Sequence, residues 1–261
     1  LLVDGFHGVL AQAGDLRHLL VRVGHKTGEI MVVLVSATPV FPSKNNFVKA
    51  LLKAHPEITT IVHNVNDTEV NLMLGERSKI LYGRGYIEDE LCGCRFRISP
   101  DSFYQVNPVQ CEVLYNKAVE LAALTGKETL FDSYCGTGTI GIIASRHAKQ
   151  VLGVELSKSA VHDAKINAKL NGAENAYFTC DDAGEYLEHI TGEGERFDVV
   201  IMDPPRAGAR CAACGFGPPA RPVRAGAAVR GVFGAFAVGG AALRRQRGRG
   251  CWGAALRGMD R

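Results

Sequence analysis

The residues of this chain whose types and spacing can do chemistry are acids and glycines that follow apolar stretches. Phe131-Asp132-Ser133 leads into the turn Gly136-Thr137-Gly138, Glu155 ends the next apolar stretch, and Asp203 ends a later one. With Gly141 the turn satisfies G-x-G-x-x-G, which alone is a weak sign of a nucleotide site. Glu155 lies 19 residues after Gly136, the spacing expected for an acid that binds a ribose.

Asp132 separates two classes of cofactor. It places a carboxylate at the end of a strand, where we expect it to face the ligand. There it would repel a pyrophosphate, whereas it would attract S-adenosylmethionine, whose ammonium and sulfonium groups are cationic. We therefore favour a methyl donor, and a nicotinamide-dependent dehydrogenase is the competing interpretation.

Four further acidic residues, at the ends of three expected strands, have both a binding and a structural interpretation. Glu155 accepts hydrogen bonds from a ribose diol, or it is a solvated acid at the end of a strand. Asp181 and Asp182 lie where an adenine amino group would sit, or they cap the following helix. Asp203 precedes Pro204-Pro205, which would hold the acid rigidly at the ligand-binding edge of a sheet, and a plain proline loop is the alternative.

Residues 1–100 predict a compact α/β or α+β domain. Alternation punctuated by Gly24 and Gly28 indicates a hairpin, and helical spacing of apolar residues indicates a helix. The expected elements are the hairpin over 17–35, the helix over 44–55, a strand over 59–65 and two short strands within 79–98.

Residues 101–208 predict a parallel, doubly wound sheet because strands alternate with helices. In the first helix the apolar positions are Val113, Leu114, Ala118, Leu121 and Ala122. The fold class is thus α/β, a Rossmann-like sheet preceded by a smaller α/β or α+β domain. The expected strands cover 129–134, 150–155, 175–180 and 197–202, and the expected helices cover 109–123, 139–148, 158–171 and 183–190.

The composition is ordinary for a globular protein of the cytoplasm. Hydrophobic residues make up 46% and charged residues 22% of the 261, and no apolar run reaches the roughly 18 residues that span a bilayer. No signal peptide is recognisable, and the absence of an initiator Met predicts that the chain begins within a longer protein. The eight cysteines are scattered, which favours a reducing compartment over disulfides. We expect no metal site and no membrane association.

The last 53 residues differ sharply from the rest. Residues 209–261 contain ten arginines, no lysine and one acid, which leaves 20 basic and 26 acidic residues and a net charge of −6 for 1–208. Ala, Gly and Arg dominate, and no strand or amphipathic helix pattern is recognisable. A basic arm for nucleic acid is one interpretation. We favour the other, in which this stretch is a coding region read in the wrong frame.

Four motifs together resemble the bacterial RNA (uracil-C5-)methyltransferases that act on 23S ribosomal RNA. The resemblance covers about 14–208, and implies a class I methyltransferase domain that binds S-adenosylmethionine and acts on RNA. Ribosomal RNA is the substrate we favour over transfer RNA. The resemblance implies that Gln105, Tyr134, Glu155 and Asp203 contact the cofactor, with Thr139 and Asp181 as weaker members. The motifs are Phe103–Pro108, Asp132–Thr139, Gly153-Val154-Glu155 and Asp203–Gly208.

The resemblance also implies a covalent mechanism that this chain cannot complete. In the family a cysteine thiolate adds to C6 of the uracil, C5 takes the methyl group, and a base removes the C5 proton. The nucleophile follows the Asp-Pro-Pro-Arg motif within a Ser-Cys-Asn-Pro-like turn, and the base is a later glutamate. Neither segment is present, and Cys211, Cys214 and Cys251 stand in no comparable context. The catalytic residues are therefore unknown, and we expect weak cofactor binding without methylation.

Two alternatives within nucleic-acid biology stay open. The first is methylation of an exocyclic amine, although Arg206 stands where such enzymes carry an aromatic residue after Asp203-Pro204-Pro205. The second is a non-catalytic RNA-binding protein that uses the Arg/Gly tail on phosphates. The sequence does not identify protein partners.

Overall fold

The computed structural model describes residues 16–68, 73–203 and 230–233. The chain separates into two compact units. The first extends to Glu90 and includes Arg95–Ser102, and the second comprises Leu91–Cys94 and the chain from Phe103 onward. Pro204, Pro205 and Arg206, on which part of the sequence argument rests, lie outside the described residues.

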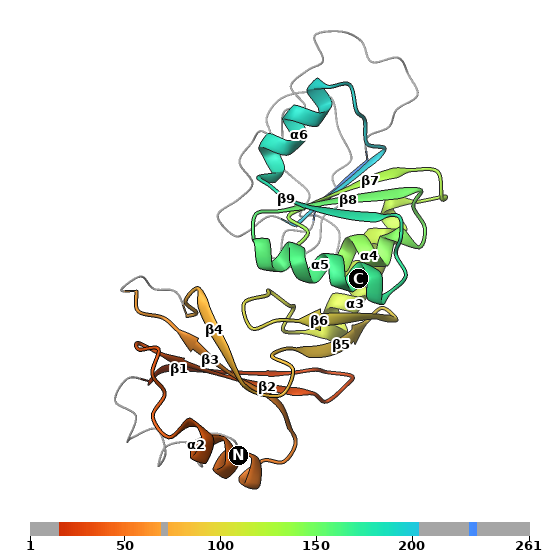
Figure 1. The fold of residues 1–261 in the computed structure, drawn as a ribbon. Coiled ribbons are helices and arrows are strands. Elements are labelled where there is room, and N and C mark those ends of the chain that lie inside the picture. Colours follow the sequence, from red (N-terminus) through yellow and green to blue (C-terminus); the bar gives the residue numbers. More distant parts are fainter. Residues whose placement is uncertain (1–15, 69–72, 204–229, 234–261) are drawn as a thin grey trace, which may run out of the picture. The chain divides into compact units, whose positions relative to one another are not determined.

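The first unit is built on a four-stranded sheet in the order β1-β2-β3-β4. β1 pairs with β2 as the expected antiparallel hairpin, and α2 connects β2 to its parallel neighbour β3 (Figure 1). Apolar residues of β2, β3 and α2, including Val32, Leu34 and Leu51, form its core. The elements are β1 (Leu16–Val23), β2 (Ile30–Ser36), α2 (Lys44–Ala54), β3 (Ile58–Val65), β4 (Arg77–Tyr82), β5 (Ile87–Leu91) and β6 (Cys94–Ile98).

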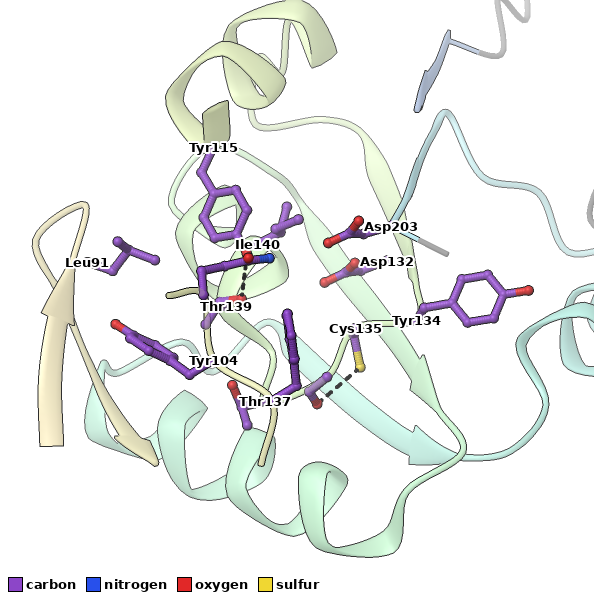
Figure 2. Close-up of a pocket in the computed structure, with 13 residues that line it drawn as sticks. Leu91, Tyr104, Tyr115, Asp132, Tyr134, Cys135, Thr137, Thr139, Ile140 and Asp203 are labelled. Atoms are coloured by element: carbon purple, nitrogen blue, oxygen red, sulfur yellow. Dashed lines mark hydrogen bonds between the residues drawn. The ribbon is translucent and has the colours of Figure 1, made fainter. Parts of the chain in front are cut away.

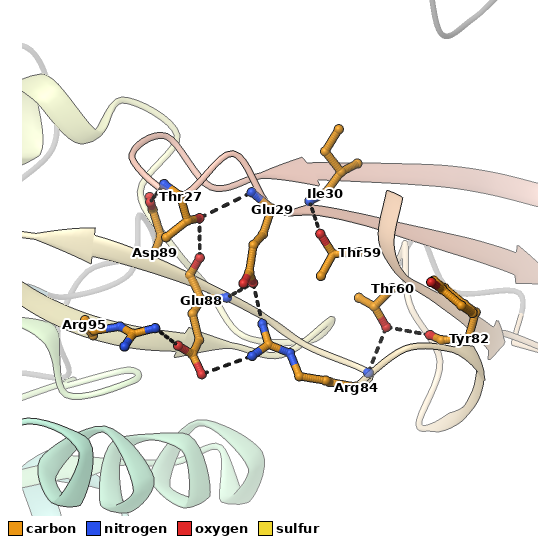
Figure 3. A network of polar contacts seen from close by, with 11 residues as sticks. Thr27, Glu29, Ile30, Thr59, Thr60, Tyr82, Arg84, Glu88, Asp89 and Arg95 are labelled. Carbon is orange, nitrogen blue, oxygen red and sulfur yellow. Dashed lines mark hydrogen bonds and ion pairs between the residues drawn. The ribbon is translucent and has the colours of Figure 1, made fainter. Parts of the chain in front are cut away.

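Three strands, not the expected two, occupy the glycine-rich stretch near residue 85. Two separate turns cause the difference. Gly83 and Gly85 have φ of 74° and 79°, and Cys92 and Gly93 have φ of 51° and 69°, so the chain reverses once before β5 and once after it. Polar side chains link these strands to the hairpin turn, since Arg84 pairs with both Glu29 and Glu88 (Figure 3).

The second unit is the predicted parallel, doubly wound sheet. Its five strands run in the order β11-β10-β7-β8-β9, and all their pairings are parallel. Its elements are α3 (Pro108–Ala122), β7 (Thr129–Ser133), α4 (Thr139–Ser145), β8 (Gln150–Glu155), α5 (Lys158–Leu170), β9 (Ala176–Cys180), α6 (Ala183–Gly192), β10 (Val199–Met202) and β11 (Arg230–Phe233).

Helices cover both faces of this sheet. Leu187 of α6 packs with Phe131, Val154 and Val200 on one face, whereas α4 and α5 contact β8 and β9 from the other (Figure 1). The α/β class with a Rossmann-like sheet is therefore confirmed.

Two local features differ from what the sequence pattern alone indicates. In α3 the buried stripe is Cys111, Tyr115, Ala118 and Ala122. Of the apolar positions seen in the sequence, Ala118 and Ala122 are therefore buried, whereas Val113 and Leu121 are 61% and 38% exposed. The other concerns the tail, for which no strand pattern was recognised: residues 230–233 form β11, which pairs with β10. Most of the tail lies outside the described residues.

Candidate cofactor site

The second unit has a pocket where β7 and β10 end, about 420 Å³ of empty space including its open mouth. Ligands of open α/β sheets bind at this edge. Residues from four elements and their loops line it, with the carboxylates of Asp132 and Asp203 side by side (Figure 2). The lining residues are Leu91, Phe103, Tyr104, Gln105, Tyr115, Asp132, Tyr134, Cys135, Gly136, Thr137, Thr139, Ile140 and Asp203.

The turn after β7 is tightly wound. Tyr134, Gly136 and Gly138 have φ of 62°, 55° and 80°, all in the left-handed region. For a non-glycine residue such as Tyr134 this conformation costs roughly 1–2 kcal/mol. At Gly138 a Cβ would lie 2.9 Å from Cζ of Phe178 on β9, so the turn also needs the absence of a side chain there. These constraints bring the start of α4 close to the sheet.

Three backbone amides of the glycine turn and of the start of α4 are already bonded to the protein. The N–H of Gly136 donates to Oε2 of Glu155 at 3.1 Å, and the N–H of Gly138 donates to the Cys135 carbonyl at 2.9 Å. The N–H of Gly141, in the first turn of α4, donates to Oδ2 of Asp132 at 2.9 Å. Phosphates bind at a helix N-terminus through free amides and the positive end of the dipole. Here a carboxylate occupies that place, which disfavours a pyrophosphate.

The pocket is acidic, and its acids disturb one another. Asp132 is buried, and its pKa is raised to about 7, mainly by burial. The hydrogen bond from Gly141 lowers this pKa, and the nearby charges of Asp203 and Glu155 raise it. Burial also raises the pKa of Asp203 to about 6. A cationic ligand would favour the ionised forms of both acids. The electrostatics of the pocket therefore favour a cation.

Tyr115 is a pocket residue that the sequence did not indicate. Its hydroxyl lies 3.4 Å from Oγ1 of Thr139, and burial raises its pKa well above the usual value (Figure 2). It belongs to the buried stripe of α3 together with Cys111. That stripe is visible in the sequence as an i, i+4, i+7 pattern, but its approach to Thr139 depends on the tertiary fold.

Cys135 lines the pocket without the features of a nucleophile. Its thiol is buried, and burial, Asp132 and Glu155 all raise its pKa, so the thiolate is disfavoured. Burial likewise raises the pKa of Cys111 to about 12. None of the five cysteines in the described residues forms a disulfide, and no group of metal-ligating side chains is found among those residues.

The structure brings together four of the six residues predicted to contact the cofactor. Gln105, Tyr134, Thr139 and Asp203 line the pocket, although the ring of Tyr134 points away from Thr139 (Figure 2). Glu155 lies outside the lining but is joined to it through Gly136. Its other oxygen accepts the N–H of Ser157 at 3.0 Å, so the carboxylate is fixed at the end of β8.

Asp181 and Asp182, at the end of β9, have different surroundings. Asp182 accepts the N–H groups of Gly184 and Glu185 at 2.9 and 3.1 Å and so caps α6. Asp181 is exposed, does not line the pocket, and accepts the N–H of Asp182 at 2.8 Å. The structure thus assigns the capping role to Asp182.

Comparison with curated proteins gives relatives that are named as RNA methyltransferases. An uncharacterized RNA methyltransferase of Enterococcus faecalis is 48% identical over 195 residues, which are 75% of this chain and 43% of that protein. One of Halalkalibacterium halodurans is 46% identical over the same shares. The chain spans less than half the length of the curated relatives it matches.

A solved structure supports the fold. The chain resembles the tRNA (uracil-54, C5)-methyltransferase of Pyrococcus abyssi, crystallised with S-adenosyl-L-homocysteine, with 29% identity and a TM-score of 0.59. The match covers 76% of this chain and 45% of that one. A family described as Conserved hypothetical protein 95 matches residues 112–213, which include the glycine turn and Glu155. That description is not the uracil-C5 family whose motifs the sequence resembles.

None of the helices within the described residues has the length and apolar character that crossing a bilayer requires.

Proposed function

We propose that the second unit binds S-adenosylmethionine and belongs to a cytoplasmic RNA (uracil-C5-)methyltransferase. One observation carries the proposal: the carboxylate of Asp132 accepts an amide of the first turn of α4, where a phosphate would bind, and together with Asp203 gives the pocket a preference for cations. The names of the relatives support RNA as the substrate. The Pyrococcus abyssi enzyme, which acts on a uracil in tRNA, supports C5 of uracil as the target.

The residues of the pocket suit the groups of this cofactor. When bound, S-adenosylmethionine supplies an electrophilic methyl group on a positively charged sulfur. Asp203 and Asp132 would face its cationic ammonium and sulfonium groups, and Glu155, fixed by Gly136 and Ser157, retains lone pairs for the ribose hydroxyls. Gln105, Tyr134, Thr139 and Asp181 remain proposed contacts.

We infer further that this chain binds the cofactor without methylating RNA. The thiols of Cys135 and Cys111 have raised pKa values, so neither is suited to attack a uracil ring. The segments expected to carry the nucleophile and the base are absent from the sequence. Ribosomal RNA is the substrate that we favour for the complete enzyme, and transfer RNA is the competing one.

Isothermal titration calorimetry separates the cofactor classes. We expect S-adenosylmethionine to bind and NADH to give no signal, and the reverse result would refute the proposal. A radiolabelled methyl-transfer assay on uracil-containing RNA tests the second inference, for which we expect no turnover. If methyl groups are transferred, mass spectrometry of the nucleosides distinguishes C5-methyluridine from methylation of an exocyclic amine.

A further inference from the structure

A second cavity lies entirely within the first unit and shares no residue with the cofactor pocket. It encloses about 1130 Å³ of empty space, including its open mouth. The segment between β2 and α2 forms one side, and β3 and β4 contribute the rest. Its lining residues are Pro39, Val40, Phe41, Pro42, Ser43, Lys44, Asn45, Asn46, His63, Lys79 and Leu81.

The lining of this cavity is basic, although residues 1–208 carry a net charge of −6. It contains Lys44 and Lys79 and no acid. Among the described residues, neither lysine has a carboxylate within ion-pair distance. Lys79 also lowers the pKa of His63, after the larger effect of burial. The cavity therefore offers two cations to an anionic ligand.

His63 of β3 lines the cavity and is hydrogen-bonded to Ser36, which does not line it. Nε2 of His63 lies 2.6 Å from Oγ of Ser36, and that hydroxyl donates to the carbonyl of Thr38 at 2.7 Å. Since the hydroxyl proton is directed to Thr38, the imidazole N–H donates to Ser36 and does not activate it. This hydrogen bond holds the His63 ring in place, and its direction leaves the Ser36 hydroxyl unactivated for hydrolysis.

Val40 and Phe41 form an apolar wall of the cavity, and the Phe41 ring packs against the imidazole of His63, with ring centroids 5.4 Å apart. Phe41 is half-buried and held edge-on against Phe47, with ring centroids 5.1 Å apart and planes at 72°. Val40 beside it is 68% exposed. Proteins that bind single-stranded nucleic acid combine such surfaces for the bases with cations for the backbone. The amides of Asn45 and Asn46 supply both donors and acceptors, which base edges require.

We propose that this cavity binds a short segment of single-stranded RNA. Lys44 and Lys79 contact its phosphates, and a base lies against the wall formed by Val40 and Phe41. An acidic peptide would use the two lysines but not the wall, so RNA accounts for more of the lining. The choice of RNA rests on the proposed function, whereas the preference for a polyanion rests on the cavity alone.

The test compares two double variants of the full chain that lose the same charge. Lys44→Gln/Lys79→Gln removes the cations of the cavity, and Lys49→Gln/Lys53→Gln removes two exposed lysines of α2 that do not line it. Binding of a fluorescent uridine octamer is measured by anisotropy between 0.05 and 0.3 M KCl. Single-stranded contacts contribute about 0.7 each to the salt slope, so the cavity variant should lose about 1.4 and roughly 25-fold in affinity at 0.1 M salt.

A photo-crosslink provides a local readout that the arginine-rich tail does not obscure. An octamer containing 4-thiouridine should crosslink to the peptide around Phe41, and the crosslink should disappear in the cavity variant only. Crosslinks confined to other segments, or equal losses in both double variants, would overturn the proposal. Equal competition by a glutamate octapeptide would assign the cavity to acidic peptides instead. Binding of S-adenosylmethionine should stay unchanged in both variants, so failure here is distinguishable from failure of the proposed function.

Discussion

Replacing Asp132 by Asn tests whether its charge selects the cofactor. The carboxylate is buried and accepts the N–H of Gly141 at 2.9 Å. The amide oxygen of Asn can accept the same hydrogen bond, so the substitution removes the charge while the start of α4 keeps its acceptor. Glu174→Gln is the matched control, because Glu174 is exposed and does not line the pocket.

The expected loss of affinity follows from Coulomb's law. Two opposite unit charges about 5 Å apart in an effective dielectric constant of about 20 attract each other by about 3 kcal/mol. With about 1.4 kcal/mol for each factor of ten, Asp132→Asn should weaken binding of S-adenosylmethionine on the order of 100-fold at pH 8. Binding of S-adenosylhomocysteine, which lacks the sulfonium charge, should weaken less. The control variant should bind both ligands as the unchanged chain does.

The pH dependence gives an independent check. The pKa of Asp132 is about 7, so below that pH a proton has to leave before the ionised form can face the cation. Affinity for S-adenosylmethionine should therefore fall as the pH drops below 7, by up to tenfold per unit. In Asp132→Asn, Asp203 is the remaining pocket-lining acid with a raised pKa, so the loss of affinity should begin near pH 6. Calorimetry that finds affinity constant between pH 5 and 8, or unchanged in the variant, would refute the electrostatic argument.

Asp132→Asn should weaken cofactor binding but raise the free energy of unfolding at high pH relative to the unchanged chain. A carboxyl group whose pKa rises on folding contributes stability at low pH, and this contribution is lost as the pH rises through the folded value. For Asp132, with an ordinary pKa of 3.8 and a folded pKa of about 7, the difference between pH 5 and pH 8 is about 2–3 kcal/mol. In urea unfolding, the free energy of unfolding of Asp132→Asn minus that of the unchanged chain should rise by about 2–3 kcal/mol from pH 5 to pH 8. An equal change in Glu174→Gln would contradict this account.

Three further outcomes follow from the second unit. Gly138→Ala should lower the free energy of unfolding by about 1–3 kcal/mol in urea, because φ is 80° and the new Cβ would lie 2.9 Å from Phe178. Asp182→Ala should cost about 1 kcal/mol through the lost cap of α6, while calorimetry shows unchanged binding of S-adenosylmethionine. Iodoacetamide at pH 8 should label exposed Cys180 and spare Cys135 in the native protein, as read by mass spectrometry; equal labelling would contradict the burial of Cys135.

The sequence was sufficient to predict the parallel sheet because its signals are local. The alternation of apolar stretches and amphipathic helices gave β7 to β10 within a few residues. It was not sufficient for α3, where two stripes compete. Cys111 and Tyr115 share one face, and Val113 lies about 200° around the helix from Cys111. Both stripes carry apolar side chains, so only the neighbouring elements decide which of them is buried.

The candidate site was predictable to the extent that the residues end strands. Asp132, Glu155 and Asp203 follow apolar stretches, so their meeting at one edge follows from a parallel sheet. The sequence did not reveal that Glu155 accepts an amide of the glycine turn and Asp132 an amide of the first turn of α4. These hydrogen bonds join residues 19 and 9 positions apart in the chain. The contact between Tyr115 and Thr139 joins residues 24 positions apart and has no local signal.

These amide bonds explain how one glycine pattern serves different ligands. G-x-G-x-x-G shapes a turn that exposes amides at the start of a helix, and in itself it is suited to phosphate. A carboxylate near the end of the preceding strand, β7, reverses that preference, since Asp132 accepts the hydrogen bond of the Gly141 amide and brings a negative charge of its own. Ionising that carboxylate in a buried place opposes folding, as its pKa of about 7 indicates. A cation that relieves this cost on binding is held more tightly for that reason, so the instability of the empty pocket and its selectivity have the same physical origin.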